Sequence, residues 1–348
     1  MKLFKVLKRM GHEEVVFRND LSSGLKSIIA IHSTVLGPAL GGVRMWNYNS
    51  EEEALRDVLC LSRGMTYKNA AMGLNLGGGK AVIIGDPHKD KSEELFRAFG
   101  KFVESLGGRY ITAEDVGTCK EDMNYISQET SYVTGLEGKS GDPSPITAYG
   151  VFLGIKACIE WVFGSDDLKE KTVAVQGLGH VGMELARLLY EAGANLIVAD
   201  IYSERVKKLQ RKFPEVQAVE PEKIYGVWCD IFSPCALGAV VNENTVEQLK
   251  CKIVAGSANN QLEDDALAER LSQRGILYAP DYIINGGGVI NIAEELTGLP
   301  YNREKVLSKL SVIPMRLKEV FHLSLSENIT TVKAAEIITS KRFKVRGN

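Results

Sequence analysis

Residues 172–182 read TVAVQGLGHVG, and this stretch decides the fold of the second half of the chain. The apolar run 172–176 predicts a buried strand, and residues 181–192 predict a helix with one apolar face. Glycines at the spacing Gly-x-Gly-x-x-Gly allow the backbone at the helix N-terminus to approach a pyrophosphate. The turn therefore predicts six cofactor-binding positions, with His180 read as a variable one: Gly177, Leu178, Gly179, His180, Val181 and Gly182.

A second strand follows at 195–199, NLIVA, and ends in Asp200. An acid at this place accepts hydrogen bonds from an adenosine ribose, and its charge repels a 2′-phosphate. The alternative is an acid that only ends a strand. The complete strand–turn–helix–strand context favours the ribose. We therefore expect an α/β protein with a Rossmann, doubly wound domain that binds NAD rather than NADP.

The bulk composition limits the remaining possibilities. A length of 348 residues predicts two domains, and 45% hydrophobic with 25% charged residues is typical of soluble proteins. A net charge of −2 gives no basis for binding nucleic acid or an anionic membrane. No run approaches the ~20 apolar residues of a membrane span, and lysines interrupt the N-terminus too often for a secretory signal.

Cysteine and histidine usage adds two expectations. The six cysteines are scattered without a Cys-x-x-Cys pair, which fits reduced thiols in a cytoplasm. The five histidines show no metal-ligand spacing, so we expect no metal site. Cys235 has no histidine base near it in sequence, so a packed thiol is favoured over a nucleophile.

Two lysines mark the first half of the chain, Lys68 and Lys80, with no acid between them. A helix predicted to begin after Ser50 places Lys68 on the same face as its apolar stripe. Lys80 follows three glycines and leads into the apolar run 81–84, at the mouth of a predicted buried strand. Burial lowers the pKa of a lysine and makes it a usable base.

The alternative is that both lysines bury only their stems and keep their ammonium groups in water. A third polar residue, Asp115, lies in the loop 113–117 that follows the predicted strand 109–112, a place where active residues are common. Two lysines around Gly-Gly-Gly together with this acid indicate a catalytic site. The run is not a Walker loop, because Ala81 stands where Ser or Thr would hold magnesium.

Residues 135–148, GLEGKSGDPSPITA, are rich in Gly, Pro and Ser and predict the boundary between two domains. Beyond it, strands are predicted near 230–232, 252–255 and 276–280, and the helix that opens at 285–291 carries Ile292. Small polar residues at 257–261 are expected to line the crevice for the nicotinamide half of the dinucleotide.

Taken together, from Gly11 to about Ile338, these motifs resemble the glutamate, leucine, phenylalanine and valine group of amino acid dehydrogenases. The resemblance rests on seven segments in order: 37–42 GPALGG, 63–68 RGMTYK, 77–80 GGGK, 113–117 AEDVG, 177–182 GLGHVG, 258–261 ANNQ and 285–289 NGGGV. It implies an N-terminal substrate and oligomerisation domain over 1–138, with 328–348 returning to it. It also implies a Rossmann domain over 139–327, with the active site in the cleft between the domains.

The resemblance also implies roles for single residues. Lys68 would pair with the substrate carboxylate, Lys80 would be the base that activates water, and Asp115 would handle the amine proton. Contacts to nicotinamide or to the polar end of the substrate would come from Thr147, Asn259, Asn260 and Asn285. The implied reaction is the NAD-dependent, reversible conversion of an L-amino acid to a 2-oxo acid and ammonia.

The expected substrate side chain is a branched aliphatic one. Glutamate enzymes of the family carry a lysine where Leu40 stands here, so an anionic side chain would meet an apolar wall. Ala113 and Val289 resemble the leucine type, whereas the phenylalanine type tends to have glycine and a bulkier residue. The remaining expected pocket residues are Gly41, Met65, Thr134 and Ile292. One methylene is worth about 1–3 kcal/mol in such a pocket, so leucine, valine and isoleucine should overlap.

Several alternatives stay open at this point. The loop 136–142 and the C-terminus are shorter than in the leucine type, so the homo-oligomer could be a dimer or an octamer, and phenylalanine or tryptophan could be the substrate. A non-catalytic NAD-binding regulator is disfavoured by the presence of Lys68, Lys80 and Asp115. A hydroxy-acid or malic-type dehydrogenase would need a catalytic histidine or a metal cluster.

Overall fold

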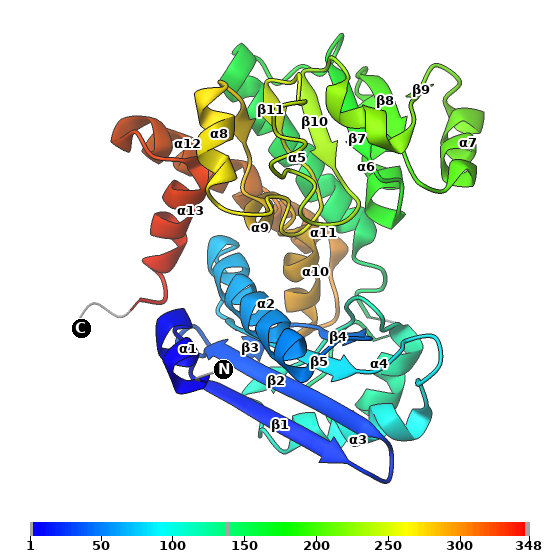
Figure 1. Cartoon of the computed structure of the whole chain (residues 1–348), viewed down its shortest axis with the longest axis vertical. Coiled ribbons are helices and arrows are strands. Elements are labelled where there is room, and N and C mark those ends of the chain that lie inside the picture. Colours follow the sequence, from blue (N-terminus) through cyan, green and yellow to red (C-terminus); the bar gives the residue numbers. More distant parts are fainter. Residues whose placement is uncertain (1–2, 137–138, 345–348) are drawn as a thin grey trace. The chain divides into compact units, whose positions relative to one another are not determined.

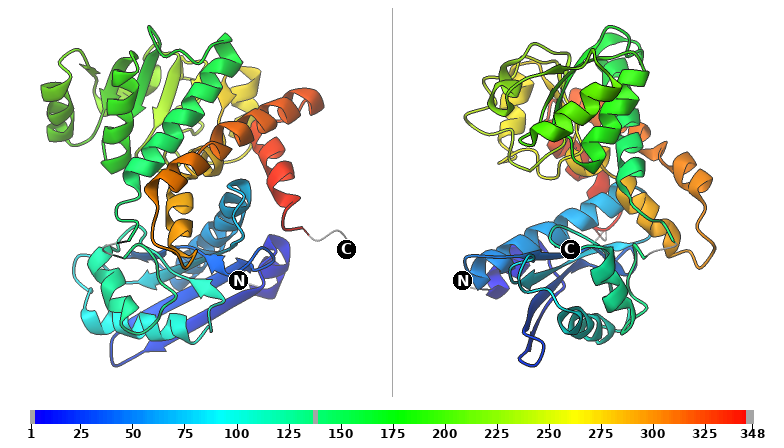
Figure 2. Two further views of the ribbon diagram at one scale, coloured as in Figure 1. Left: turned by 180° about the vertical axis from the view of Figure 1, so that it is seen from behind. Right: turned by 90° about the vertical axis from the view of Figure 1, so that its right-hand side faces the viewer.

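The structure is a computed structural model that describes residues 3–136 and 139–344 (Figures 1 and 2). The chain forms two compact units. Unit 1 comprises Met1–Asp142, Ile292–Asn302 and Thr339–Asn348, and unit 2 comprises Pro143–Asn291 and Arg303–Ile338. The first division falls inside the predicted boundary 135–148. The return of 292–302 to unit 1 was not predicted, and it follows from packing of Ile292 and Leu296 against Leu40.

Unit 1 is built on one mixed sheet whose order is β1-β2-β5-β3-β6, with β4 also paired to β5. Its strands are β1 (Glu14–Asp20), β2 (Leu25–Ser33), β3 (Ala39–Leu40), β4 (Val43–Trp46), β5 (Gly77–Ile84) and β6 (Tyr110–Ile111). β5 is central, since it runs antiparallel to β2 and parallel to β3 and β4. The hairpin of β1 with β2 was not predicted, because β1 lacks a clear alternation of buried and exposed residues.

Residues 37–42, whose glycines and proline are typical of a tight turn, contain a short strand in their middle. Ala39 and Leu40 pair with Gly77 and Gly78 as the short strand β3. The turn lies earlier, where the N–H of Gly37 donates to the carbonyl of Thr34 over 3.0 Å with Gly37 at φ +138°.

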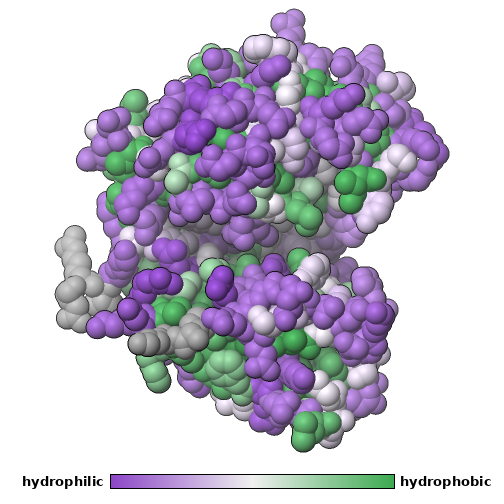
Figure 3. Space-filling view, in the orientation of Figure 1, coloured by the Kyte–Doolittle hydropathy of each residue, from purple (hydrophilic) through white to green (hydrophobic). Residues whose placement is uncertain are grey.

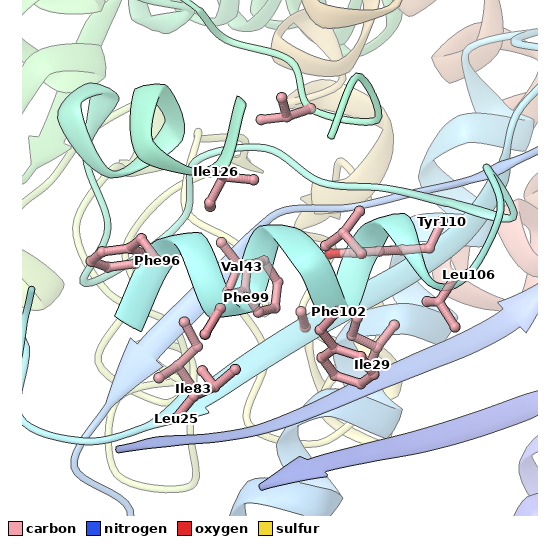
Figure 4. Close-up of a cluster of buried hydrophobic side chains, with 14 of the residues drawn as sticks. Leu25, Ile29, Val43, Ile83, Phe96, Phe99, Phe102, Leu106, Tyr110 and Ile126 are labelled. Atoms are coloured by element: carbon pink, nitrogen blue, oxygen red, sulfur yellow. The ribbon is translucent and has the colours of Figure 1, made fainter. Parts of the chain in front are cut away.

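The two faces of this sheet bury different side chains. Leu25, Ile29 and Ile83 pack with phenylalanines of α3 (Glu93–Glu104) and with α4 (Lys120–Ser127), as Figure 4 shows. The alternate residues, among them Ile28 and Val82, pack with α1 (Leu3–Met10) and α2 (Glu51–Ala71). Each fully buried side chain of this size contributes about 1.5–3 kcal/mol. Lys80 stands two residues before Val82 on β5, so its side chain leaves the strand on the α2 face.

Helix α2 begins as predicted, with the N–H of Glu53 donating to the hydroxyl of Ser50 over 3.1 Å. In a capping box the Glu53 carboxylate would accept from the N–H of Ser50, but here it accepts from the N–H of Asn49 over 2.8 Å. The helix lies directly on β5, because a Cβ at Gly78 would come within 2.1 Å of the backbone nitrogen of Thr66. The glycines before Lys80 therefore permit close helix–strand packing.

Unit 2 contains a six-stranded parallel sheet of order β12-β11-β10-β7-β8-β9. Its strands are β7 (Thr172–Gln176), β8 (Asn195–Ala199), β9 (Gln217–Ala218), β10 (Ile231–Pro234), β11 (Ile253–Val254) and β12 (Leu277–Tyr278). The order reverses between β7 and β10, which is the switch point where doubly wound sheets bind dinucleotides. The predicted Rossmann fold is confirmed.

Helices cover this sheet in two groups, which can be followed in Figure 2. Helices α5 (Ser144–Phe163), α6 (His180–Glu191), α9 (Asp281–Ile284) and α12 (Val312–Glu327) pack against one another. Phe232, Val254 and Tyr278 pack instead with Ile224 of η1 (Pro221–Gly226) and with α8 (Leu267–Gln273). The remaining helices are α7 (Ser203–Lys212), α10 (Gly287–Glu295), α11 (Arg303–Lys309) and α13 (Thr331–Ser340).

Helix α5 corrects one expectation from the sequence. No run was expected to approach the length of a membrane span, but α5 covers Ser144–Phe163 and, in the part of the chain that the structure describes, it is the one helix that is long and apolar enough to cross a membrane. Half of the most apolar stretch of this helix is buried inside the structure. A Cβ at Gly150 would come within 2.7 Å of Ile313, so α12 packs closely on this helix. A helix in the core of a compact unit can be as long and as apolar as a helix that crosses a membrane.

The surface differs from these cores in composition. Figure 3 shows hydrophilic side chains over most of the visible face of each unit, with hydrophobic groups scattered between them. Single exposed hydrophobic residues are ordinary on protein surfaces. The distribution is therefore typical of surfaces in contact with water.

Candidate active site

Lys80 and Asp115 form the most buried ion pair of the candidate site. Lys80 lies inside β5, opposite Ala30 of β2, and not at the mouth of the strand as predicted. Its side chain is 5% exposed, and its Nζ lies 2.8 Å from Oδ1 of Asp115, whose side chain is 19% exposed. The N–H of Asp115 donates to the hydroxyl of Thr118 over 2.9 Å, which fixes the loop after β6. The structure therefore brings the two predicted catalytic residues together.

Arg44 on β4 is the second cationic partner of Asp115. Its Nε donates to Oδ2 of Asp115 over 2.9 Å. Burial alone would raise the pKa of Asp115, but the charges and hydrogen bonds of Lys80 and Arg44 outweigh burial and lower this pKa. Asp115 is therefore held as a carboxylate.

The site contains more charged groups than the two lysines and Asp115 that the sequence predicted. A terminal nitrogen of the Arg44 guanidinium lies 3.1 Å from Asp57. Charges of opposite sign therefore alternate along a chain of four side chains, in the order Lys80, Asp115, Arg44 and Asp57. A buried charge is tolerated when it is paired and hydrogen-bonded. The role of Lys80 as a base stays a prediction.

An apolar cluster in unit 1 contains two of the predicted pocket residues, Leu40 and Ile292. Leu40 is 1% exposed and packs with Leu76 and Ile111. A carboxylate brought against Leu40 would therefore meet apolar atoms and lose its hydration.

Gly41 and Met65 lie close together, since a Cβ at Gly41 would stand 3.3 Å from Cγ of Met65 and only 1.8 Å from the carbonyl oxygen of Gly79. Met65 and Lys68 are both half-buried on α2, the helix that packs on β5. The structure therefore places Lys68 on the helix that covers the face of β5 from which Lys80 extends.

Ala113 lies in the loop that follows β6, and Thr134 lies beside the residue before it, Thr112. Both are buried. The N–H of Thr134 donates to the carbonyl of Thr112 over 3.0 Å, and the carbonyl of Ala113 accepts from the N–H of Val43 over 2.8 Å. Ala113 is therefore two residues from Asp115 along the chain, and the role of Ala113 and Thr134 in a substrate pocket stays a prediction.

In unit 2 the glycine turn has the geometry that its spacing predicts. Gly177 has φ +94°, and its N–H donates to the carbonyl of Ala199 over 2.8 Å. A Cβ at Gly182 would lie 2.0 Å from the carbonyl oxygen of Gly177 and 3.1 Å from Cβ of Cys235. His180 is exposed at the start of α6, and Val181 follows it half-buried. A helix with this N-terminus offers backbone donors to a pyrophosphate.

Replacing Gly182 with alanine should destabilise the cofactor-free protein by about 1–3 kcal/mol, because the new methyl overlaps backbone that cannot move freely. Thermal unfolding of the purified protein without cofactor measures this change. Gly179→Ala is the matched control, since a Cβ at Gly179 meets nothing within 4 Å. Equal melting temperatures for the two variants would contradict the close packing at this turn.

Asp200 lies at the end of β8, as predicted, and organises the turn. Its Oδ2 accepts from the N–H of Leu178 over 2.6 Å, and its Oδ1 accepts from the N–H of Tyr202 over 2.8 Å. Its side chain is 4% exposed and lies 3.4 Å from a guanidinium nitrogen of Arg205. A carboxylate oxygen has room for further donors, so these contacts leave lone pairs for a ribose.

Asn285 and Asn259 meet at a second polar centre in unit 2. The side-chain amide of Asn285 donates to Oδ1 of Asn259 over 2.8 Å and to the carbonyl of Ser257 over 3.2 Å. Asn285 is buried, and within the described parts of the chain its Oδ1 has no hydrogen-bond partner. An unsatisfied buried acceptor suits the carboxamide N–H of a nicotinamide. The residues present therefore fit the predicted cofactor.

The other predicted residues of unit 2 lie on neighbouring segments. Asn260 is exposed in the left-handed region, at φ +49°, and its carbonyl accepts from the N–H of Ala239 over 2.7 Å. Thr147 lies in the first turn of α5, and its hydroxyl oxygen would stand 3.0 Å from a Cβ at Gly288. Val289 is buried one residue further along α10.

Three observations bear on the alternatives that the sequence left open. Burial raises the pKa of the Cys235 thiol, as expected of a packed side chain rather than a nucleophile. No group of three or more His, Cys, Asp or Glu side chains that could hold a metal ion occurs among the described residues. The six cysteines are free thiols.

Arg44 and Asp57 are the residues that sequence reasoning missed. Arg44 stands two residues after the segment 37–42, and no role in the site was predicted for it. A usable signal was present, since an arginine stands between the apolar residues Val43 and Met45 in a short strand. Such a charge in a strand that joins a central sheet needs a partner.

Comparison with known proteins agrees with this arrangement. Residues 12–132 match the family described as Glu/Leu/Phe/Val dehydrogenase, dimerisation domain, and residues 138–203 and 198–345 match Glutamate/Leucine/Phenylalanine/Valine dehydrogenase. The chain is 56% identical over 347 residues to leucine dehydrogenase of Geobacillus stearothermophilus, covering 99% of this chain and 94% of that protein.

Two further relatives act on aromatic amino acids by their names. Phenylalanine dehydrogenase of Lysinibacillus sphaericus is 52% identical over 335 residues, covering 94% of this chain and 87% of that protein. The crystal structure of L-tryptophan dehydrogenase from Nostoc punctiforme has a TM-score of 0.85 and 45% identity, covering 98% of each chain.

Proposed function

Because the chain belongs to the glutamate, leucine, phenylalanine and valine dehydrogenase family, we propose that it catalyses the NAD-dependent, reversible oxidative deamination of branched-chain L-amino acids. L-leucine is the main proposed substrate, with L-valine and L-isoleucine beside it, and the products are the 2-oxo acid and ammonia. The single observation that carries the proposal is the buried ion pair of Lys80 and Asp115, 2.8 Å long, in the unit that also buries Leu40.

The proposed chemistry assigns one task to each polar residue. Lys68 holds the substrate carboxylate, and Asp115 accepts a hydrogen bond and then a proton from the substrate amine. Lys80, once it has given up its proton and is a neutral amine, takes a proton from the water that adds to the imine carbon, and ammonia leaves with a proton returned through Asp115. The nicotinamide of bound NAD supplies the acceptor for the hydride that leaves Cα.

Several features of unit 2 support NAD as the cofactor. The turn 177–182 would hold the pyrophosphate, Asp200 the adenosine ribose, and Asn285 with Asn259 the nicotinamide carboxamide. The negative charge of Asp200 favours NAD over NADP, although Arg205 lies 3.4 Å from it and offsets part of that charge. Activity with both cofactors therefore needs to be compared.

The substrate assignment is supported by the apolar surroundings of Leu40 and by the leucine dehydrogenases among the relatives. The phenylalanine and tryptophan dehydrogenases are specific alternatives, because they share 52% and 45% identity with the chain. A regulator that binds NAD without catalysis is disfavoured, since it would have no use for the buried Lys80–Asp115 pair.

A substrate panel tests the proposal. L-leucine, L-valine and L-isoleucine with NAD at alkaline pH should each give growth of the reduced-nicotinamide absorbance, while D-leucine and L-glutamate should give little. NADP should support slower turnover than NAD with L-leucine. Turnover with L-phenylalanine or L-tryptophan alone would change the proposed substrate class to aromatic amino acids. No turnover with any amino acid would overturn the proposal.

We also propose that the protein acts in the cytoplasm as a homo-oligomer, either a dimer or an octamer. The free cysteines and the matched dimerisation domain support this proposal. Light scattering of the purified protein distinguishes the two assemblies, and a monomer would contradict both.

A further inference from the structure

The guanidinium of Arg44 is shared between two carboxylates on different elements. Its Nε donates to Asp115 over 2.9 Å, and a terminal nitrogen donates to Oδ2 of Asp57 on α2 over 3.1 Å. The hydroxyl of Tyr48 donates to the same Asp57 oxygen over 2.6 Å. Tyr48 therefore holds the Asp57 carboxylate in place, and the two carboxylates of Asp115 and Asp57 together hold the guanidinium of Arg44.

The backbone holds Arg44 in register with the loop that carries Asp115. The N–H of Val43 donates to the carbonyl of Ala113 over 2.8 Å, and the N–H of Met45 donates to the carbonyl of Val116 over 3.0 Å. Arg44 stands between these two bonds. The hydroxyl of Thr118 adds a bond to the carbonyl of Val43 over 3.0 Å. Strand β4 and the loop therefore form one unit, and the side-chain contact is not a flexible surface pair.

We propose that Arg44 is a positioning residue for the reaction, which fixes the Asp115 carboxylate with Oδ1 toward Lys80 and keeps it ionised, while Asp57 and Tyr48 hold Arg44 in place. The inference rests on the proposed function and extends it to residues that would not touch the substrate. When a guanidinium holds one oxygen of a carboxylate, the carboxylate has a single orientation. The other oxygen of Asp115 is therefore already directed at Lys80 before the reaction starts.

The electrostatic part of the argument concerns the sum of the groups that face Asp115. Burial opposes its charge, and the two cations Lys80 and Arg44 support it. Asp57 is the further anion in the chain. Tyr48 and Tyr110 are both neutral, because burial raises the pKa of each hydroxyl and a neighbouring carboxylate, Asp57 for Tyr48 and Asp115 for Tyr110, raises it further. Without Arg44, only Lys80 would stabilise the charge of Asp115, while burial and Asp57 would still destabilise it. The pKa of Asp115 would therefore rise.

Arg44→Gln should lower kcat for L-leucine by about 10²-fold, since a small misplacement of a catalytic group has an effect of that size. The KM for L-leucine should change less than kcat, because Arg44 is not placed on the substrate. The acidic limb of the kcat profile should move to higher pH by about one pH unit or more. A merely structural pair would not move this limb.

Two companion variants sharpen the test. Arg44→Lys keeps the charge but cannot donate to two carboxylates in a fork, so an intermediate kcat with a near wild-type acidic limb is expected. Asp57→Asn removes an anion and should lower kcat without moving the acidic limb upward. If Arg44→Gln does not fold, Arg44→Lys carries the test, and wild-type kcat in that variant would overturn the proposal.

Arg97→Gln is the matched control, because Arg97 also pairs with a carboxylate of unit 1, Glu129, at 2.7 Å and away from the site. Its pH profile should equal that of the wild type. An unmoved acidic limb in Arg44→Gln, or an equal shift in Arg97→Gln, would contradict the role of Arg44.

A titration without substrate separates this proposal from the proposed function. Carbon-13 NMR of aspartate carboxyls, with Asp115 assigned by comparison with Asp115→Asn, should show a higher titration midpoint for Asp115 in Arg44→Gln. This readout does not need turnover, so it remains decisive if no amino acid is oxidised. An unchanged midpoint would overturn the inference while leaving the proposed function untouched.

Discussion

Lys80→Ala should lower kcat for L-leucine oxidation by about 10³-fold, which lies within the range for loss of a general base. Water adjacent to the imine carbon would then have no group to take its proton. The variant should still fold, because Arg44 remains 2.9 Å from Asp115 and compensates its charge. Initial rates at saturating NAD and L-leucine measure the loss, and fluorescence titration measures NAD affinity, which should not change.

A second paired lysine of unit 1 provides the control for this variant. Lys91, whose side chain is 27% exposed, pairs over 2.5 Å with Asp122, whose side chain is 6% exposed, and it is not one of the residues assigned to the proposed site. Lys91→Ala removes a comparable ion pair and should leave kcat within about twofold of the wild type, since no transition-state interaction is lost. Unchanged turnover in Lys80→Ala would show that the base has been assigned to the wrong residue.

Leu40→Lys should lower kcat/KM for L-leucine by about 10³-fold. An ammonium in this apolar cluster lacks a partner when an aliphatic side chain is bound, and desolvating a polar group costs a few kcal/mol. Each 1.4 kcal/mol is a tenfold change. The same lysine offers a partner to a side-chain carboxylate, so activity with L-glutamate should rise above the wild-type level.

Leu40→Met controls for the change of shape, since a volume-conserving swap in a core costs less than about 1.5 kcal/mol. It should retain most of the activity with L-leucine. Undiminished activity with L-leucine in Leu40→Lys would mean that this position does not contact the substrate side chain, and the aliphatic pocket would have to lie elsewhere.

The most accurate sequence predictions are those whose physical cause is local. Strands β7 and β8 have the bounds that the apolar runs 172–176 and 195–199 predicted. Helix α2 starts after the capping residue Ser50, as predicted, and the hydroxyl of Ser50 accepts from the N–H of Glu53 over 3.1 Å. In each case a buried run or a cap acts within a few residues. The acid at the end of β8 follows from the same local unit.

Features that depend on distant partners were not predicted. Ala39 and Leu40 become a strand only because β5 and β6 lie on either side of them. Residues 292–302 join unit 1 because Ile292 packs with Leu40, far away in sequence. The partnership of Lys80 with Asp115 could be proposed, but the contribution of Arg44 required the register of β4 against β5.

The most direct test of the central claim uses L-leucine deuterated at Cα together with NAD and the purified protein. We predict that the deuterium appears in the reduced nicotinamide, observed by mass spectrometry, with one 2-oxo acid and one ammonia formed for each. Reduced cofactor without deuterium, or leucine that stays intact at alkaline pH, would contradict the claim that this chain moves a hydride from an amino acid to NAD.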